Sequence, residues 1–134
     1  MLLVQYRFRQ SYRTLHLGGC NNHENSNHIW PRDIRIEEVD IPVIGPDDVL
    51  VQVKASGICG SDVHRYLGTD YGRGYYNYPM NSGHEYCGDV VQTGNRVKEV
   101  RERERVTLGV SWVSGKLGAF SEYVAYTECR QRVM

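Results

Sequence analysis

Two short segments of the chain carry the side chains whose types and spacing could do chemistry. Residues 57–64 contain the thiol of Cys59, and residues 79–88 contain the imidazole of His84 and the carboxylate of Glu85. Zinc is bound by thiolate sulfur, imidazole nitrogen and carboxylate oxygen, and a catalytic zinc keeps one position open for water or substrate. The three residues therefore fit a catalytic zinc site. The spacing alone also fits a cysteine packed as a small apolar group and a histidine bonded to a backbone carbonyl.

Short strands separated by turns would have to position these segments. Ile34 and Ile36 alternate with charged residues, and Val49, Val51 and Val53 repeat the two-residue period that predicts a strand. Three further segments are rich in β-branched or aromatic residues, which favour strands: residues 86–93, 105–110 and 120–126. The pattern predicts a mostly β architecture.

One helix is expected, at residues 61–67. Ser61 is a favourable N-cap, and Asp62 is a favourable charge in a first turn. Most of the 14 glycines fall between Gly57 and Gly118, as suits a barrel whose corners need close backbone approach.

The first 29 residues differ from the rest in composition. Arg7, Arg9 and Arg13 all precede the first acidic residue, Glu24. An arginine-rich, acid-poor start resembles a mitochondrial transit peptide, although a frayed extension is the simpler interpretation. We expect an atypical extension over residues 1–29, one domain over residues 30–126 and a C-terminal stub over residues 127–134.

The Asn-rich stretch at residues 18–28 is expected to be a linker within this extension. Cys20, His23 and His28 lie in or near it, but a metal clip built from them would lack a fourth ligand.

Charge and cysteine usage bound the partners and the compartment. The chain has 16 Lys plus Arg and 16 Asp plus Glu, so no global field favours nucleic acid or an anionic membrane. No apolar stretch approaches the roughly 20 residues of a membrane-spanning helix. The four cysteines lie far apart and no signal peptide precedes them, which favours a reducing compartment. We expect a cytoplasmic protein with a small-molecule partner, the mitochondrion being the alternative.

The two chemistry-bearing segments together resemble the paired signatures of the zinc-dependent medium-chain alcohol dehydrogenase family, and of its sorbitol and xylitol branch in particular. The family pattern of Gly-His-Glu, a further glycine, a small residue and an aliphatic one is met by Gly83, His84, Glu85, Gly88, Gly94 and Val97. Residues 33–42, 48–54 and 118–124 resemble strands of the same domain. The resemblance covers roughly residues 32–126, and it implies a GroES-like β-barrel with few short helices.

The resemblance implies a role for each residue of the zinc site. Cys59 and His84 would be ligands, and Glu85 would bind directly or through water. Asp62 would accept a hydrogen bond from the second nitrogen of the ligand imidazole, as metal-bound histidines usually require.

The resemblance also implies a proton relay through Ser61 and His64. In related enzymes the hydroxyl bonds the substrate alcohol, and the histidine, with a pKa of about 6.5, passes the proton outward. A plain N-cap for Ser61 and an exposed helix position for His64 are the alternatives. The activity would be hydride transfer from an alcohol or polyol, with zinc stabilising the alkoxide and a nicotinamide accepting the hydride.

The chain departs from the family in three places. It contains no Gly-x-Gly-x-x-Gly between a strand and a helix, and we interpret Gly72-Arg73-Gly74 as a turn. We therefore expect a truncated catalytic domain without the Rossmann domain, an incomplete zinc site, and NAD or NADP only in a full-length parent. The four cysteines of a structural zinc are missing between residues 106 and 118. Arg103 replaces the glycine of a tight turn and is expected to strain it.

Three functions stay open at this point. The chain is an oxidoreductase domain that is inactive alone, a non-catalytic zinc-binding or interaction module, or a fragment from a truncated gene. The surface left by the missing domain would favour association.

Overall fold

The computed structural model describes residues 22–69, 78–108 and 118–127. The described part contains seven strands and one helix. In chain order they are β1 (Asn22–Trp30), β2 (Asp33–Asp40), β3 (Asp48–Gly57), α1 (Gly60–Leu67), β4 (Met80–Asn81), β5 (Glu85–Thr93), β6 (Arg105–Leu108) and β7 (Tyr123–Thr127). The mostly β architecture expected from the sequence is confirmed.

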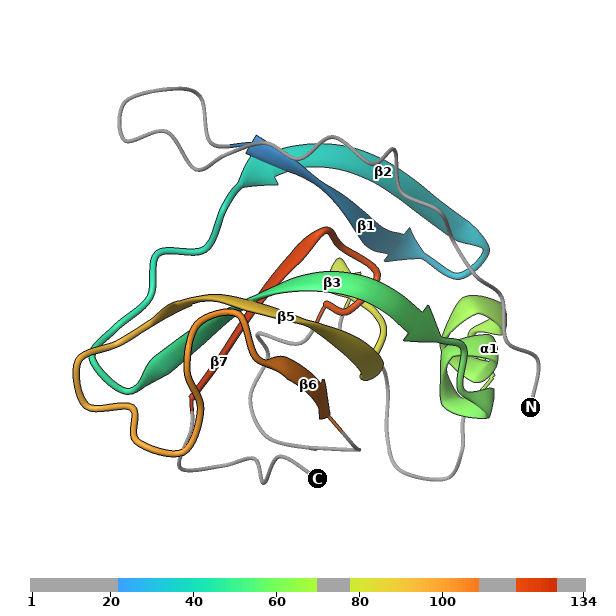
Figure 1. Ribbon diagram of the computed structural model, residues 1–134. Helices are drawn as coiled ribbons and strands as arrows, with labels where there is room; N and C mark the ends of the chain where they lie inside the picture. Colours follow the sequence, from blue (N-terminus) through green and yellow to red (C-terminus); the bar gives the residue numbers. More distant parts are fainter. Residues whose placement is uncertain (1–21, 70–77, 109–117, 128–134) are drawn as a thin grey trace.

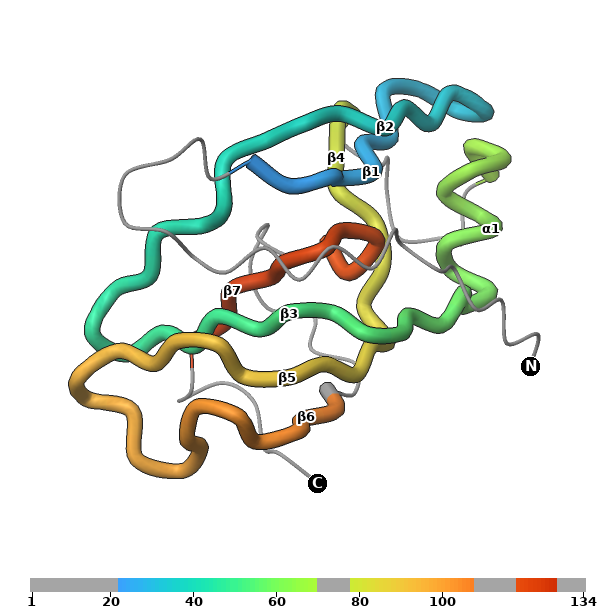
Figure 2. The backbone as a smooth tube through the Cα atoms, turned by 45° about the horizontal axis from the view of Figure 1, so that its top comes forward, coloured from blue at the N-terminus to red at the C-terminus, as the bar shows by residue number. Residues whose placement is uncertain are grey.

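The strands form two antiparallel sheets. One sheet has the order β2-β1-β4, and the other has the order β6-β5-β3-β7. Figure 1 shows the β1–β2 hairpin lying across the four-stranded sheet. A bridge between Asn25 and Ser121 joins the two layers, with the Ser26 N–H donating to the Phe120 carbonyl at 2.8 Å. At one end of the molecule β3 leads into α1 (Figure 2).

The core lies mainly on the four-stranded sheet. Val49 and Val51 of β3 are fully buried on one face of the strand, and Leu50 is buried on the opposite face. Buried valines and tyrosines from the neighbouring strands complete the cluster, among them Val90, Val106 and Val124. This core fixes the long β3–β5 pair that runs to the end of the sheet at α1.

Strand β1 corrects the expectation for the N-terminal part. Residues 22–28, expected in a linker, pair with β2 from Asn22 to Trp30. The strand has no apolar alternation because its buried positions, His23, Asn25 and His28, hold polar side chains. Asn25 donates to the Asn81 side-chain oxygen at 2.9 Å, and His28 Nδ1 lies 2.9 Å from Ser82 Oγ. Buried polar groups are tolerated when they are hydrogen-bonded, so tertiary partners hold a strand that its pattern does not predict.

The other predicted elements are present, but several of their ends differ: β7 begins at Tyr123 and not at residue 120. Thr127, placed in the C-terminal stub, ends β7, and β4 was not predicted at all. The predicted strand at residues 105–110 is found over Arg105–Leu108, and its last two residues lie outside the described part. The described part also excludes residues 1–21, which contain Cys20, and the segment Gly72-Arg73-Gly74. No helix in the described ranges is long and apolar enough to span a membrane.

The turn before β6 has the strain expected from its sequence. Arg103 has φ of 73°, a conformation that favours glycine. Its N–H donates to the Val90 carbonyl at 2.8 Å, so pairing with β5 holds the residue in place. The residues of the run 101–105 are all exposed, which confirms a solvated face there.

Candidate metal centre

The end of β3 and the start of β5 place the predicted ligands side by side. In the antiparallel β3–β5 pair, Gly57 lies opposite Glu85 at the last register position. Cys59 lies two residues beyond the end of β3, and His84 immediately precedes β5. Strand pairing therefore brings together two segments that are distant in sequence.

Cys59, His84 and Glu85 form one compact group of donors. Their candidate ligand atoms, the thiol sulfur, an imidazole nitrogen and a carboxylate oxygen, all lie within 4.8 Å of one another. Among the residues that the structure describes, this is the one such group of three or more. Cys59 is a free thiol and is partly buried, and the His84 side chain is 11 % exposed.

Gly57 makes room for the carboxylate in this group. A Cβ atom at Gly57 would lie 2.8 Å from Glu85 Oε2 and 3.4 Å from Glu85 Cβ. Such contacts would displace the Glu85 side chain. The Ser56 hydroxyl also donates to the Glu85 carbonyl at 3.1 Å, which fixes the backbone at this position.

Asp62 holds the start of α1 against the donor group. The helix begins after Cys59, not at Ser61 as the sequence suggested, and the Cys59 N–H donates to Asp62 Oδ2 at 3.0 Å. The other oxygen, Oδ1, accepts from Arg65 Nη1 at 3.1 Å and lies 3.6 Å from His84 Nδ1. Asp62 is 4 % exposed, so burial makes these contacts necessary.

His84 Nδ1 is buried and has no hydrogen-bond partner. Its separation from the Asp62 carboxylate is longer than a hydrogen bond. The other ring nitrogen, Nε2, lies 3.5 Å from Ser61 Oγ on the first turn of α1. The ring is thus placed between a carboxylate on one side and a hydroxyl on the other.

Of the two predicted relay residues, Ser61 lies against the donor group, with Oγ 3.5 Å from His84 Nε2. His64 lies three positions further along α1, on the same helix face. Its Nδ1 is 2.8 Å from the hydroxyl oxygen of Thr69, just beyond the helix.

Two residues of this region were not singled out from the sequence. Gly57 was recognised only as part of a motif, and its register opposite Glu85 reveals its role. The side chain of Arg65 bonds Asp62, and its carbonyl accepts from the Tyr78 hydroxyl at 2.5 Å. The period of α1 could have suggested the Asp62–Arg65 pair. Cys87, a further cysteine near this site, lies opposite Ala55 and outside the group.

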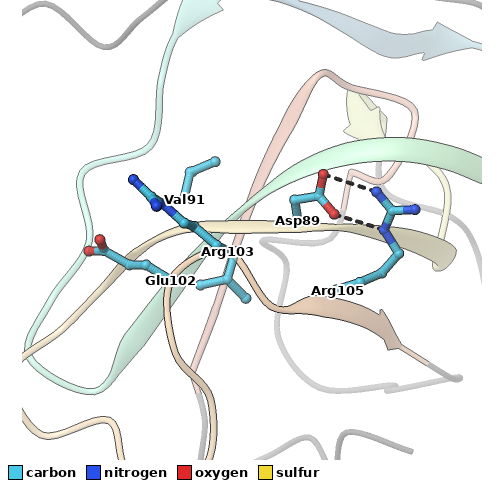
Figure 3. Close-up of a pocket in the computed structure, with 6 residues that line it drawn as sticks. Asp89, Val91, Glu102, Arg103 and Arg105 are labelled. Atoms are coloured by element: carbon cyan, nitrogen blue, oxygen red, sulfur yellow. Dashed lines mark hydrogen bonds and ion pairs between the residues drawn. The ribbon is translucent and has the colours of Figure 1, made fainter.

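An open groove elsewhere on β5 is separate from the donor group. Its volume is about 720 Å³, and it is lined by Asp89, Val90, Val91, Glu102, Arg103 and Arg105 (Figure 3). Arg105 donates two hydrogen bonds to the Asp89 carboxylate, at 2.8 and 3.1 Å, and this contact holds the pKa of Asp89 below its usual value. The groove contains none of the predicted ligands.

Comparison with known proteins gives a family match and curated relatives. The alcohol dehydrogenase GroES-like domain matches residues 45–133. L-threonine 3-dehydrogenase of Caldanaerobacter subterraneus is 40% identical over 84 residues, which are 63% of this chain and 24% of that protein. Sorbitol dehydrogenase of Mus musculus is 42% identical over 78 residues, which are 58% of this chain and 22% of that protein. The chain thus matches about a quarter of the length of these relatives.

Solved structures resemble this fold over most of the chain. The 2R,3R-butanediol dehydrogenase of Bacillus subtilis gives a TM-score of 0.71 at 29% identity, over 84% of this chain and 40% of that one. A structure from Sinorhizobium meliloti, described as a zinc-binding dehydrogenase bound to NADP, gives 0.66 at 27% identity, over 84% and 38%.

Proposed function

The chain belongs to the alcohol dehydrogenase GroES-like domain family, and from this premise we propose that it is the zinc-binding catalytic domain of an NAD(P)-linked alcohol or polyol dehydrogenase. The observation that carries the proposal is the convergence of Cys59, His84 and Glu85, whose ligand atoms lie within 4.8 Å of one another. Family membership accounts for the presence of these donor residues where β3 ends and β5 begins.

The residues present fit a zinc ion in three respects. Sulfur, nitrogen and carboxylate oxygen are the donor types that zinc takes. The buried Nδ1 of His84 faces the Asp62 carboxylate, which leaves Nε2 as the ligand atom and matches the usual partnership of a metal-bound histidine. Gly57 leaves space for the Glu85 carboxylate. A fourth position would be taken by substrate or water, or by a ligand from outside the described residues.

Zinc, when bound, would act as a Lewis acid that lowers the pKa of an alcohol hydroxyl. The residues of this chain would hold and orient the reacting groups. Ser61 Oγ, 3.5 Å from the ligand nitrogen of His84, would accept the proton of the substrate hydroxyl and donate its own onward. His64, on the same helix face, would carry that proton towards solvent.

The hydride would pass to NAD or NADP, because no side chain accepts hydride. The 134 residues contain no Gly-x-Gly-x-x-Gly segment. The nicotinamide would therefore be held by residues other than these, and we expect the 134-residue chain alone to be inactive. The substrate class follows from the relatives' names, which describe hydroxyl compounds such as sorbitol and butanediol. The free thiols of Cys59 and Cys87 support a reducing compartment, the cytoplasm or the mitochondrion.

Zinc content of purified variants tests the proposal. We expect the wild-type chain to retain zinc, below one equivalent, and Cys59→Ser and His84→Asn to lose most of it. Cys87→Ser is the matched control, since Cys87 is also a partly buried free thiol but lies outside the donor group, and it should retain zinc. Equal zinc in Cys59→Ser and Cys87→Ser would refute the site.

An activity assay separates the enzyme domain from a non-catalytic module. The chain alone should give no alcohol-dependent reduction of NAD or NADP. Joining it to the nucleotide-binding part of a related butanediol or sorbitol dehydrogenase should restore turnover that Ser61→Ala reduces. A folded, zinc-loaded hybrid without turnover would favour the non-catalytic module.

A further inference from the structure

Strand β2 forms an outer edge of the three-stranded sheet. The order of that sheet is β2-β1-β4, so β1 covers one side of β2 only. None of the strands that the structure describes pairs with the other side, and Figure 1 shows β2 at the outside of the molecule. An eight-residue edge whose outer backbone groups pair with no strand in the described ranges is a template for pairing with another strand.

The backbone contacts of β1 reveal which residues of β2 point outward. Ser26 donates its N–H to Phe120, on the side of β1 away from β2. Its neighbour Asn25 therefore points its backbone groups at β2, where it lies opposite Glu37. Because successive residues point to opposite edges, Ile36 presents its N–H and C=O at the outer edge. The same holds for every second residue along the strand.

One face of this edge strand carries two exposed isoleucines. Ile34 is 43% exposed and Ile36 is 55% exposed, and they lie two residues apart on the same face of the strand. Glu38 and Asp40 follow on that face, so its apolar part is limited to the first half of β2.

On the opposite face the charges alternate in sign, with Asp33, Arg35 and Glu37 in succession. Arg35 uses Nε and Nη2 to bond the Asp33 carboxylate, at 3.1 and 2.8 Å. That contact raises the pKa of Arg35. The third nitrogen of the guanidinium, Nη1, takes no part in these two hydrogen bonds. Glu37 accepts from Asn27 through Oε2 at 3.2 Å, which leaves Oε1 outside this bond.

We propose that β2 is a self-association edge, on which a second copy of this chain pairs antiparallel about a two-fold axis through Ile36. In this register Ile36 lies opposite Ile36 of the second copy, and Arg35 lies opposite Glu37 of the second copy, twice by symmetry. The outward-pointing residues then pair with one another, giving about six backbone hydrogen bonds across the edge. The two Arg–Glu pairs occupy non-hydrogen-bonded positions, where opposite Cα atoms are only about 4.5 Å apart.

Like charges exclude the neighbouring registers. The outward residues can meet one another only in registers that shift by two positions. A shift in one direction sets Arg35 against Arg35 of the second copy, with Asp33 against Glu37. A shift in the other direction sets Glu37 against Glu37 of the second copy. Since like charges directly opposite are destabilising, the register centred on Ile36 is favoured over both of these neighbours.

Sedimentation of the 134-residue chain over a concentration series tests the proposal. The wild type should show a monomer–dimer equilibrium, and Arg35→Glu and Glu37→Arg should each weaken the dimer by about tenfold or more. The double variant, which exchanges the two charges, should recover part of the association. Glu102→Arg, a charge reversal in the exposed loop before β6, is the control and should dimerise as the wild type does.

Circular dichroism checks that each variant is folded, and zinc content should be unchanged in all of them because β2 contributes nothing to the donor group. A wild type that stays monomeric would overturn the proposal. So would single and double variants that dimerise equally. If Cys59→Ser loses zinc but still dimerises, the dimer at β2 does not depend on the zinc site.

Discussion

Asp62 joins three groups around the candidate metal centre. Its carboxylate accepts from the Cys59 backbone and from Arg65, and it faces His84 Nδ1 at 3.6 Å. A carboxylate in this place both orients the imidazole and positions the segment that carries the thiol. Asp62 touches the candidate ligand residues without being one of the candidate donors. Its effect should therefore appear in metal affinity.

We predict that Asp62→Asn weakens zinc binding by about 10–100-fold, because the amide cannot satisfy both the imidazole and Arg65. Competition with a chromophoric chelator measures the change. Asp47→Asn removes an exposed carboxylate that pairs with Arg96, and it should leave the zinc affinity as it is. Equal affinities in the two variants would contradict the role given to Asp62.

A second residue-scale prediction concerns the turn before β6. Arg103 has a φ of 73°, which costs an L-residue about 1–2 kcal/mol relative to glycine. We expect Arg103→Gly to stabilise the chain by about 0.5–1 kcal/mol, after the greater backbone entropy of glycine in the unfolded chain is subtracted. Urea unfolding measures the difference. Arg101→Gly, in the same exposed run but without a positive φ, should be neutral or destabilising.

Among the elements, β1 is a strand whose buried side chains are polar. His23 and His28 are 5 % and 2 % exposed, and burial lowers the pKa of both. Nearby charges modify this effect less: Glu122 raises the pKa of His23, whereas Asp62 and Arg65 act on His28 in opposite directions. Both rings are therefore held neutral in the folded chain more strongly than in the unfolded chain.

This arrangement predicts a loss of stability in acid. The unfolded histidines take up protons near their ordinary pKa of 6.5, whereas the folded ones resist until lower pH. The contribution is therefore complete above that pH and is lost as the pH falls towards the lowered values. Urea unfolding of the metal-free chain at about pH 7.5 and about pH 5.5 should show the fall. A His23→Gln, His28→Asn double variant should have a shallower dependence, and an unchanged slope would contradict this account.

At the scale of the whole molecule, the candidate site connects the two central strands at their ends. Cys59 follows β3, and Glu85 begins β5. A ligand that binds only the folded chain stabilises it by mass action. Zinc at about a hundred times its dissociation constant would contribute about 2.7 kcal/mol.

We therefore predict that zinc raises the melting temperature by about 5 °C or more, and that a chelator reverses the change. Differential scanning calorimetry measures it. Cys87→Ser should respond as the wild type does, whereas Cys59→Ser should not respond. A zinc-dependent shift that persists in Cys59→Ser would place the metal elsewhere.

The strand-rich architecture, the helix at α1 and the candidate donor residues could all be predicted from the sequence. Val49, Val51 and Val53 show the period of a strand because the face that they share is buried, and local pattern carries that information. The family resemblance, now shown by the match over residues 45–133, supplied the GroES-like fold. The roles of Ser61, Asp62 and His64 stay predictions.

The remaining features depend on contacts between segments that are distant in the sequence. The buried side chains of β1 are polar, so its pattern predicts a linker, and it becomes a strand because Asn81 and Ser82 hydrogen-bond it. Gly57 leaves room for the Glu85 carboxylate only because strand pairing places it opposite Glu85. Strand pairing and partner contacts join residues far apart along the chain, and a linear pattern does not encode which of them will meet.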